Sequence, residues 1–162
     1  MKKKLPAIFA VCGFKGSGKT TLIEHLLAEL TMRDMRVAVV KHQHEMIQID
    51  GSGTDTDRLY KAGAESVLGY DGKTVFIRSR QEDAISAEQT IGMLSGDYDL
   101  ILVEGFKESG LDKLWLLREG EDLAPEFISN VVEVLAWSDD RRAGAMEALR
   151  RLLREKYGIE LA

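Results

Sequence analysis

The sequence predicts a three-layer α/β fold, in which helices cover both faces of a mostly parallel sheet. Short runs dominated by apolar residues at positions 7–12, 36–41 and 100–103 are typical of strands buried on both faces. Between the first two runs, residues 20–32 carry leucine and isoleucine at helical spacing, which indicates a parallel strand–helix–strand unit. The length of 162 residues suits one domain, so we expect residues 1–162 to form a single domain of ordinary size.

The other elements follow from local patterns along the chain. Residues 54–62 predict a helix with Thr54 as N-cap, and residues 66–70 and 74–77 predict two strands joined by the turn Asp71-Gly72. A helix is expected at 86–94, and further strands at 114–117 and 131–136. A strongly amphipathic helix is expected at 141–157, opened by Ser138 or Asp139 as N-cap.

Composition excludes several classes of function. The net charge is −5 at pH 7, and an acidic surface repels phosphates, so we expect no broad nucleic-acid binding. No apolar stretch approaches the roughly 20 residues of a membrane helix. The first apolar run leads directly into a glycine-rich segment, which favours a strand over a secretory signal. We therefore expect the protein to be cytoplasmic. The only cysteine, Cys12, lies in that run and is expected to be a small buried residue.

The segment Gly-Phe-Lys-Gly-Ser-Gly-Lys-Thr at residues 13–20 matches the phosphate-binding P-loop pattern in full. Glycines let the backbone curl so that its N–H groups converge on an anion, and the following helix adds its N-terminal N–H groups. Lys19 supplies a charge for the outer phosphates, and the Thr20 hydroxyl is placed to bind magnesium. The predicted nucleotide-binding residues are Gly13, Phe14, Lys15, Gly16, Ser17, Gly18, Lys19, Thr20 and Thr21.

Two acidic residues are expected to join this loop at the carboxyl edge of the sheet, where open α/β sheets bind ligands. Glu104 ends the apolar run at 100–103, in the place of a magnesium-shell or water-orienting carboxylate. Asp50, in the loop after the second strand, is predicted to contact magnesium or to act as a base. The predicted metal residues are therefore Thr20, Asp50 and Glu104, with Asp50 and Glu104 also as catalytic candidates.

Other features leave alternatives open. His42 and His44 are spaced for one side of an extended segment, which is compatible with a metal but is explained more simply by polar loop contacts. The guanine signature Asn-Lys-x-Asp is absent. A carboxylate in the segment 136–140 could accept the guanine N–H groups, but a helix N-cap is the preferred interpretation.

Taken together, several elements resemble the family of molybdopterin-guanine dinucleotide biosynthesis protein B (MobB). They are the loop at 13–21, Lys-His-x-His at 41–44, Asp50, Gly-x-Asp-Thr at 53–56, Ala-Gly-Ala at 62–64 and Val-Glu-Gly-Phe-Lys at 103–107. Two positions depart from the family pattern: Glu45 stands where a second histidine is usual, and Thr54 replaces a lysine, which removes a charge.

The resemblance implies a GTP-binding accessory protein that hydrolyses GTP slowly, binds Mg²⁺ and forms homodimers. Its expected partner is the enzyme that attaches GMP to molybdopterin, giving the guanine dinucleotide form of the molybdenum cofactor. Two other functions remain open from the residues. A small-molecule kinase would need an arginine-bearing lid, for which Arg78 and Arg80 are the candidates, and a metal-insertion GTPase would need more histidine or cysteine ligands.

Overall fold

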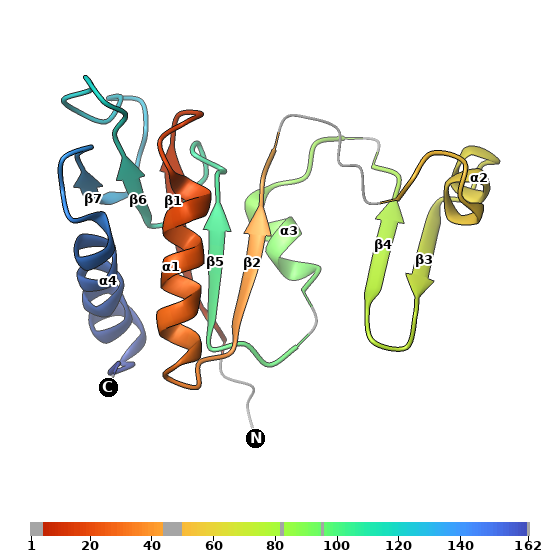
Figure 1. The fold of residues 1–162 in the computed structure, drawn as a ribbon, viewed down its shortest axis with the longest axis horizontal. Coiled ribbons are helices and arrows are strands. Elements are labelled where there is room, and N and C mark those ends of the chain that lie inside the picture. The colour runs from red at the N-terminus through yellow and green to blue at the C-terminus, as the bar shows by residue number, and fades with distance from the viewer. Residues whose placement is uncertain (1–4, 44–49, 82, 95, 162) are drawn as a thin grey trace. The chain divides into compact units, whose positions relative to one another are not determined.

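The computed structural model describes residues 5–43, 50–81, 83–94 and 96–161 (Figure 1). The chain divides into two compact units, one formed by residues 1–42 and 86–162 and the other by residues 43–85. Within the described ranges, every helix is too short or too polar to cross a membrane.

The first unit is built on a five-stranded sheet in the order β2-β5-β1-β6-β7. Its strands are β1 (Ala7–Gly13), β2 (Val37–Lys41), β5 (Leu100–Glu104), β6 (Lys113–Leu116) and β7 (Val131–Leu135). All four strand pairings are parallel. The three central strands are almost fully buried, which explains why they read as unbroken apolar runs.

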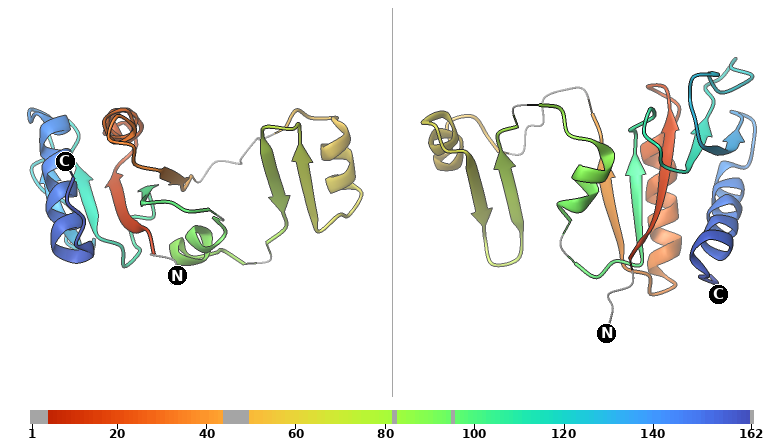
Figure 2. Two further views of the ribbon diagram at one scale, coloured as in Figure 1. Left: turned by 90° about the horizontal axis from the view of Figure 1, so that it is seen from below. Right: turned by 180° about the vertical axis from the view of Figure 1, so that it is seen from behind.

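Helices cover both faces of this sheet (Figures 1 and 2). The helices α1 (Lys19–Thr31) and α4 (Arg141–Leu152) pack on one face, and a π-helical turn, η1 (Leu153–Tyr157), continues α4. The short helix α3 (Ala87–Gly92) lies on the opposite face, where Ile91 packs against the second apolar layer. The predicted α/β architecture with a parallel sheet and helices on both faces is confirmed.

Alternation along each strand separates the core into two apolar layers. Phe9, Val11 and Leu102 belong to the layer under α1 and α4, whereas Ala10 and Val103 belong to the other layer. The lysine Lys113 is also fully buried. The ammonium of Lys113 donates to the carbonyl oxygens of Ser109 (2.7 Å) and Ser129 (2.8 Å), and burial lowers its pKa.

The second unit consists of α2 (Asp55–Lys61) and an antiparallel hairpin of β3 (Ser66–Tyr70) and β4 (Val75–Ser79). Thr54 caps α2 as predicted, accepting the backbone N–H of Asp57 at 3.3 Å. The buried Asp57 carboxylate accepts the Gly53 N–H and pairs with Lys61, and a further bond to Arg78 ties α2 to the hairpin. These contacts depress the pKa of Asp57 to about 2.

The predicted N-cap of the last helix was wrong by one or two residues. Asp140 is the N-cap, and its carboxylate accepts the Ala143 N–H at 3.1 Å. Asp139 instead accepts the Ala136 N–H at 2.7 Å, which closes the turn that follows β7. The helix itself begins at Arg141, as predicted, and only the identity of its N-cap differs.

Candidate nucleotide-binding site

The glycine-rich loop leaves the carboxyl end of β1 and curls back on itself before α1. Gly13 has φ +146°, and a Cβ there would lie 2.5 Å from the Ser17 hydroxyl oxygen. Gly16 and Gly18 also have positive φ, of +85° and +86°. Ser17 is buried and its N–H donates to the Phe14 carbonyl at 3.2 Å. Only glycine fits such a path at low cost, so the sequence dictates this loop shape.

The loop ends at the N-terminus of α1. Gly18 is the N-cap and has no side chain with which to satisfy the first N–H groups of the helix. The first turn also lacks an acidic residue that would neutralise the positive end of the helix dipole. This arrangement suits an anion held by backbone N–H groups.

The Lys19 ammonium is held against the loop backbone. It donates to the carbonyl oxygens of Gly13 (3.1 Å) and Phe14 (2.9 Å). Burial lowers the pKa of Lys19, and the nearby Glu104 carboxylate opposes that effect. Lys19 thus places a positive charge beside the curl, where the pattern requires one.

Thr20, Glu104 and Lys41 meet beside the first turn of α1. The Thr20 hydroxyl donates to both carboxylate oxygens of Glu104, at 3.0 and 3.1 Å. The Lys41 ammonium lies 3.3 Å from Glu104 Oε1 and 3.4 Å from the Thr20 hydroxyl. Glu104 is buried, whereas Thr20 and Lys41 are exposed. Hydroxyl and carboxylate oxygens are ligands that Mg²⁺ prefers, so Thr20 and Glu104 are the described pair that could hold it.

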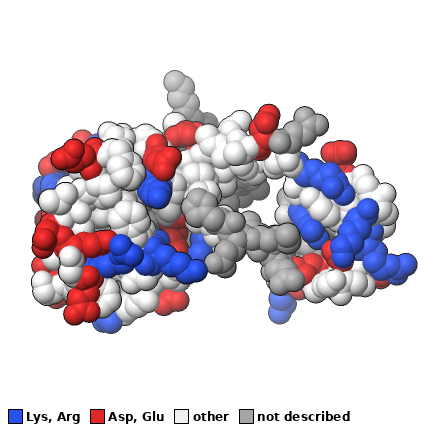
Figure 3. Space-filling view, turned by 90° about the horizontal axis from the view of Figure 1, so that it is seen from above, with Lys and Arg blue, Asp and Glu red and all other residues white. Residues whose placement is uncertain are grey.

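Sheet register explains why these residues meet. Glu104 pairs with Val11 in β1 and with Lys41 in β2, so the ends of three neighbouring strands share one edge. Figure 3 views this edge and shows lysine and arginine side chains in a row across the first unit, among acidic ones. No role was predicted for Lys41 from the sequence. Its place at the carboxyl end of the apolar run at 36–41 was the signal that could have identified it.

Asp50 belongs to the second unit, where its carboxylate accepts the hydroxyls of Thr54 (2.6 Å) and Thr56. Its predicted approach to magnesium therefore stays a prediction. His44 lies outside the described residues. Among the residues that are described, no group of three histidine, cysteine or acidic side chains could hold a metal ion.

His42 supports the turn that follows Glu104. Its ring stacks on Phe106, with centroids 4.3 Å apart and an angle of 26° between the planes. The backbone N–H of His42 donates to the Glu104 carbonyl at 2.8 Å. A Cβ on Gly105, which has φ +95°, would lie 3.2 Å from the His42 carbonyl oxygen. The described contacts of His42 thus position the Glu104 backbone.

On the other side of the loop, Arg141 joins three segments. Its guanidinium donates to the carbonyl oxygens of Ser17 (2.7 Å), Ala136 (2.8 Å) and Leu117. Burial lowers its pKa, and Asp139 offsets part of this effect. Arg141 links the phosphate loop to the ends of β6 and β7. This role was not predicted, because in the sequence the residue is recognisable only as the start of a helix.

Phe14 makes a second set of contacts on this side. Its ring meets Trp115 edge-on at 5.5 Å, and the cationic groups of Arg118 and Lys107 lie 5.0 and 5.6 Å from its centroid. Arg118 is also paired with Glu121 at 2.6 Å.

The two lid candidates pack inside the second unit. The guanidinium carbons of Arg78 and Arg80 lie 3.9 and 4.3 Å from the centroid of the Tyr60 ring. Arg80 also donates to the Ala64 carbonyl at 3.2 Å. These contacts give both arginines a structural role within the second unit.

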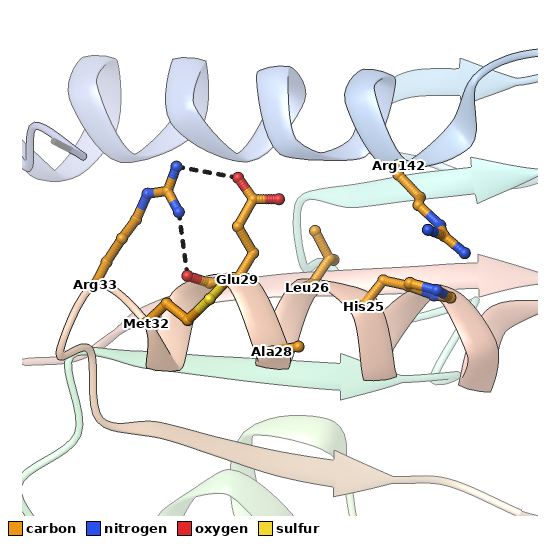
Figure 4. A pocket seen from close by; sticks show the side chains of 7 residues that line it. All are labelled: His25, Leu26, Ala28, Glu29, Met32, Arg33 and Arg142. Carbon is orange, nitrogen blue, oxygen red and sulfur yellow. Dashed lines mark hydrogen bonds and ion pairs between the residues drawn. The ribbon is translucent and has the colours of Figure 1, made fainter.

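A groove of about 440 Å³ runs between α1 and α4, away from the phosphate loop (Figure 4). An ion pair of 3.1 Å between Glu29 in α1 and Arg33 just after it lies on the α1 side of the groove. It is lined by His25, Leu26, Ala28, Glu29, Met32, Arg33 and Arg142. It contains none of the residues predicted to bind nucleotide.

Comparison with known proteins decides the family. The model of the family described as molybdopterin guanine dinucleotide synthesis protein B, MobB, matches residues 8–140. The chain belongs to the MobB family. A Methanocaldococcus jannaschii protein named a putative molybdopterin-guanine dinucleotide biosynthesis adapter protein is 39% identical over 78% of this chain, which spans 54% of that relative's length. The Haemophilus influenzae adapter protein of the same pathway is 35% identical, over 74% of this chain and 67% of its own length.

Solved structures agree with this family. A MobB homolog from Bacillus stearothermophilus superposes with a TM-score of 0.62 at 27% identity, covering 82% of this chain and 79% of the other. A molybdopterin-guanine biosynthesis protein B (mobB) structure gives a TM-score of 0.64 at 27% identity, covering 91% and 99%. The P-loop fold predicted from the glycine loop is therefore shared with MobB structures.

Proposed function

We propose that this chain binds Mg²⁺–GTP at the carboxyl edge of its parallel sheet and serves as an adapter in molybdopterin guanine dinucleotide biosynthesis. The names of its relatives support the pathway. The observation that supports nucleotide binding most directly is the Thr20 hydroxyl, which follows the curled loop and donates to Glu104 at 3.0 Å. This pairing places a hydroxyl and a carboxylate next to an anion site.

Each part of the site has a distinct task in this proposal. Backbone N–H groups of the loop bind the phosphates, and the Lys19 ammonium turns from the Gly13 and Phe14 carbonyls to the outer phosphates. Thr20 and Glu104 would hold Mg²⁺, which would supply positive charge to neutralise the phosphate oxygens. Asp50 orients or deprotonates the attacking water.

Hydrolysis is expected to be slow. An arginine aligned on the transferred phosphate contributes about 10³–10⁵ in rate. Arg141 is engaged with three backbone carbonyls, and Arg118 is paired with Glu121. Neither guanidinium can serve without breaking these contacts, so we propose that GTP binding rather than turnover is the main task.

Calorimetric titration with GTP and with ATP, each with Mg²⁺, tests the proposal. We expect a preference for GTP, and we expect Lys19→Ala to lose at least tenfold in affinity because the phosphate charge is then unmatched. Lys73→Ala is the matched control, because Lys73 lies in the hairpin turn of the second unit. Tight binding retained by Lys19→Ala, or a preference for ATP, would contradict the assignment.

The adapter role is tested with the partner enzyme that joins GMP to molybdopterin. We expect the wild-type chain to increase formation of the guanine dinucleotide at limiting GTP, and Lys19→Ala to lose the effect. Stimulation that is equal for both proteins would separate the adapter role from nucleotide binding.

We also propose a homodimer, and one surface supports it. The hairpin packs one face on α2, and its other face exposes four apolar side chains, here called the hairpin face. Leu68, Tyr70, Val75 and Ile77 form this face and are 54–69% exposed. A two-stranded hairpin is marginal alone, so covering this face with a second copy would stabilise it. We expect Ile77→Asp to shift sedimentation from dimer to monomer, while Lys73→Asp leaves the dimer intact.

A further inference from the structure

Sheet order divides the surroundings of the phosphate loop into two sides. On one side lie β5 and β2, whose ends carry Glu104 and Lys41 beside Thr20. On the other side lie β6 and β7, followed by Leu117 and by the turn at residues 136–139. If the metal and the outer phosphates occupy the first side, the nucleoside must extend across the second side or into solvent.

The second side presents one large aromatic surface next to the loop. Trp137 follows β7 and is 50% exposed. The Arg141 guanidinium lies over its ring, 4.9 Å from the centroid, and the same guanidinium donates to the Ser17 carbonyl of the phosphate loop at 2.7 Å. A single side chain therefore separates the Trp137 ring from the phosphate loop.

The carboxylates of this turn are already engaged. Asp139 accepts the Ala136 N–H and Asp140 accepts the Ala143 N–H, so each already has a structural hydrogen bond. Core packing does not account for Trp137, because half of it is exposed, unlike the fully buried Trp115. An exposed indole ring with a cation against it is suited to stacking on a planar, electron-rich group.

We propose that Trp137, backed by Arg141, is the stacking platform for the purine base of the nucleotide whose phosphates the glycine loop binds. This inference rests on the proposed nucleotide binding. Stacking needs no base-specific hydrogen bond, which fits a chain that lacks the Asn-Lys-x-Asp signature. Arg141 would then fix the distance between the platform and the phosphate loop.

The test compares GTP with inorganic tripolyphosphate, each with Mg²⁺, because tripolyphosphate has phosphates and no base. Stacking of one base on an aromatic ring is worth about 5- to 150-fold in affinity. We expect Trp137→Ala to weaken GTP binding by a factor in this range and to change tripolyphosphate binding by less than about twofold relative to the wild type. Trp137→Phe keeps an aromatic ring, so it should bind GTP nearly as tightly as the wild type. Met32→Ala, which also removes an exposed apolar side chain, should leave the affinities for both ligands unchanged.

The outcomes separate this inference from the proposed function. If Trp137→Ala lowers the affinities for GTP and for tripolyphosphate equally, Trp137 acts only through Arg141 and the stacking role is wrong. If neither affinity falls, the base binds elsewhere and the stacking role is wrong. If the wild type binds neither ligand, the proposed function fails and the platform with it.

Fluorescence gives an independent measurement. The chain has two tryptophans, of which Trp115 is fully buried and Trp137 is exposed. We expect GTP to quench the emission of the wild type and of Trp115→Phe, in which Trp137 is the remaining tryptophan. Because Trp115 contacts Phe14 of the phosphate loop, the decisive variant is Trp115→Phe, and emission of this variant that GTP leaves unchanged would overturn the proposal.

Discussion

Replacing Arg141 with methionine should destabilise the first unit strongly, because this side chain joins three separate segments. Methionine keeps an unbranched apolar stem of similar length and removes the guanidinium. The Ser17, Ala136 and Leu117 carbonyls then lose a charged donor. Hydrogen bonds to charged groups contribute about 1.5–3 kcal/mol each. Since Arg141 is only partly buried and water can replace some donors, we expect a total loss of about 2–4 kcal/mol.

Such a loss is a large part of the roughly 5–15 kcal/mol by which domains are stable. Urea unfolding followed by tryptophan fluorescence measures it, because both tryptophans lie in the first unit. Circular dichroism should give the same midpoint, which guards against a local change in emission at Trp137. A midpoint that differs between the two probes would restrict the comparison to dichroism.

Arg142→Met is the matched control. Arg142 is the next residue in α4, is exposed and lines the groove of Figure 4. Its replacement should change the free energy of unfolding by less than about 0.5 kcal/mol. If the two variants are equally stable, the three carbonyl contacts of Arg141 contribute nothing measurable, and its role as the link between loop and strands is wrong.

Three further predictions follow from local geometry. Gly13→Ala should lower stability by about 1–3 kcal/mol, since its Cβ would lie 2.5 Å from the Ser17 hydroxyl at a φ of +146°, whereas Gly110→Ala, with open space around it, should be neutral in the same thermal melt. The Cys12 thiol should resist a thiol reagent at pH 8 until urea unfolds the chain, because burial raises its pKa to about 11; rapid labelling of the native protein would contradict its burial. Asp57, whose pKa is depressed from 3.8 to about 2, stabilises the fold above pH 4 and loses this contribution as the pH falls toward 2, so the stability gap between the wild type and Asp57→Asn should narrow over that range.

Much of the fold could be predicted because its three central strands are buried on both faces, although the edge strand β2, predicted to be buried, is only partly so. A strand such as β5 has no polar alternation, so its whole length stands out in the sequence. The hairpin could also be predicted, since the turn Asp71-Gly72 separates two short segments rich in apolar residues. The buried Lys113 could not be predicted in this way. Its two acceptors are backbone carbonyls at residues 109 and 129, and their position depends on how two loops fold.

In the candidate site too, local features could be predicted from the sequence and long-range contacts could not. The glycine loop is local, and its eight residues specify their own shape and the charge beside it. Glu104 was found because it ends a buried strand. Lys41 ends the edge strand β2, but its contact with Glu104 depends on β2 and β5 being neighbours, and sequence order alone did not establish that. Arg141 meets Ser17 across 124 residues, a contact that no local pattern records.

These long-range contacts determine how the loop is held. On the metal side, Thr20 is bound to Glu104, whose backbone is fixed by His42 at the end of β2. On the other side, Ser17 is bound to Arg141, which is anchored at the ends of β6 and β7. The loop is therefore tied to neighbouring strands on both sides, not only through β1 and α1. A substitution that breaks either tie should weaken nucleotide binding even though the glycine pattern stays intact, because the N–H groups then lose the fixed convergence on which anion binding depends.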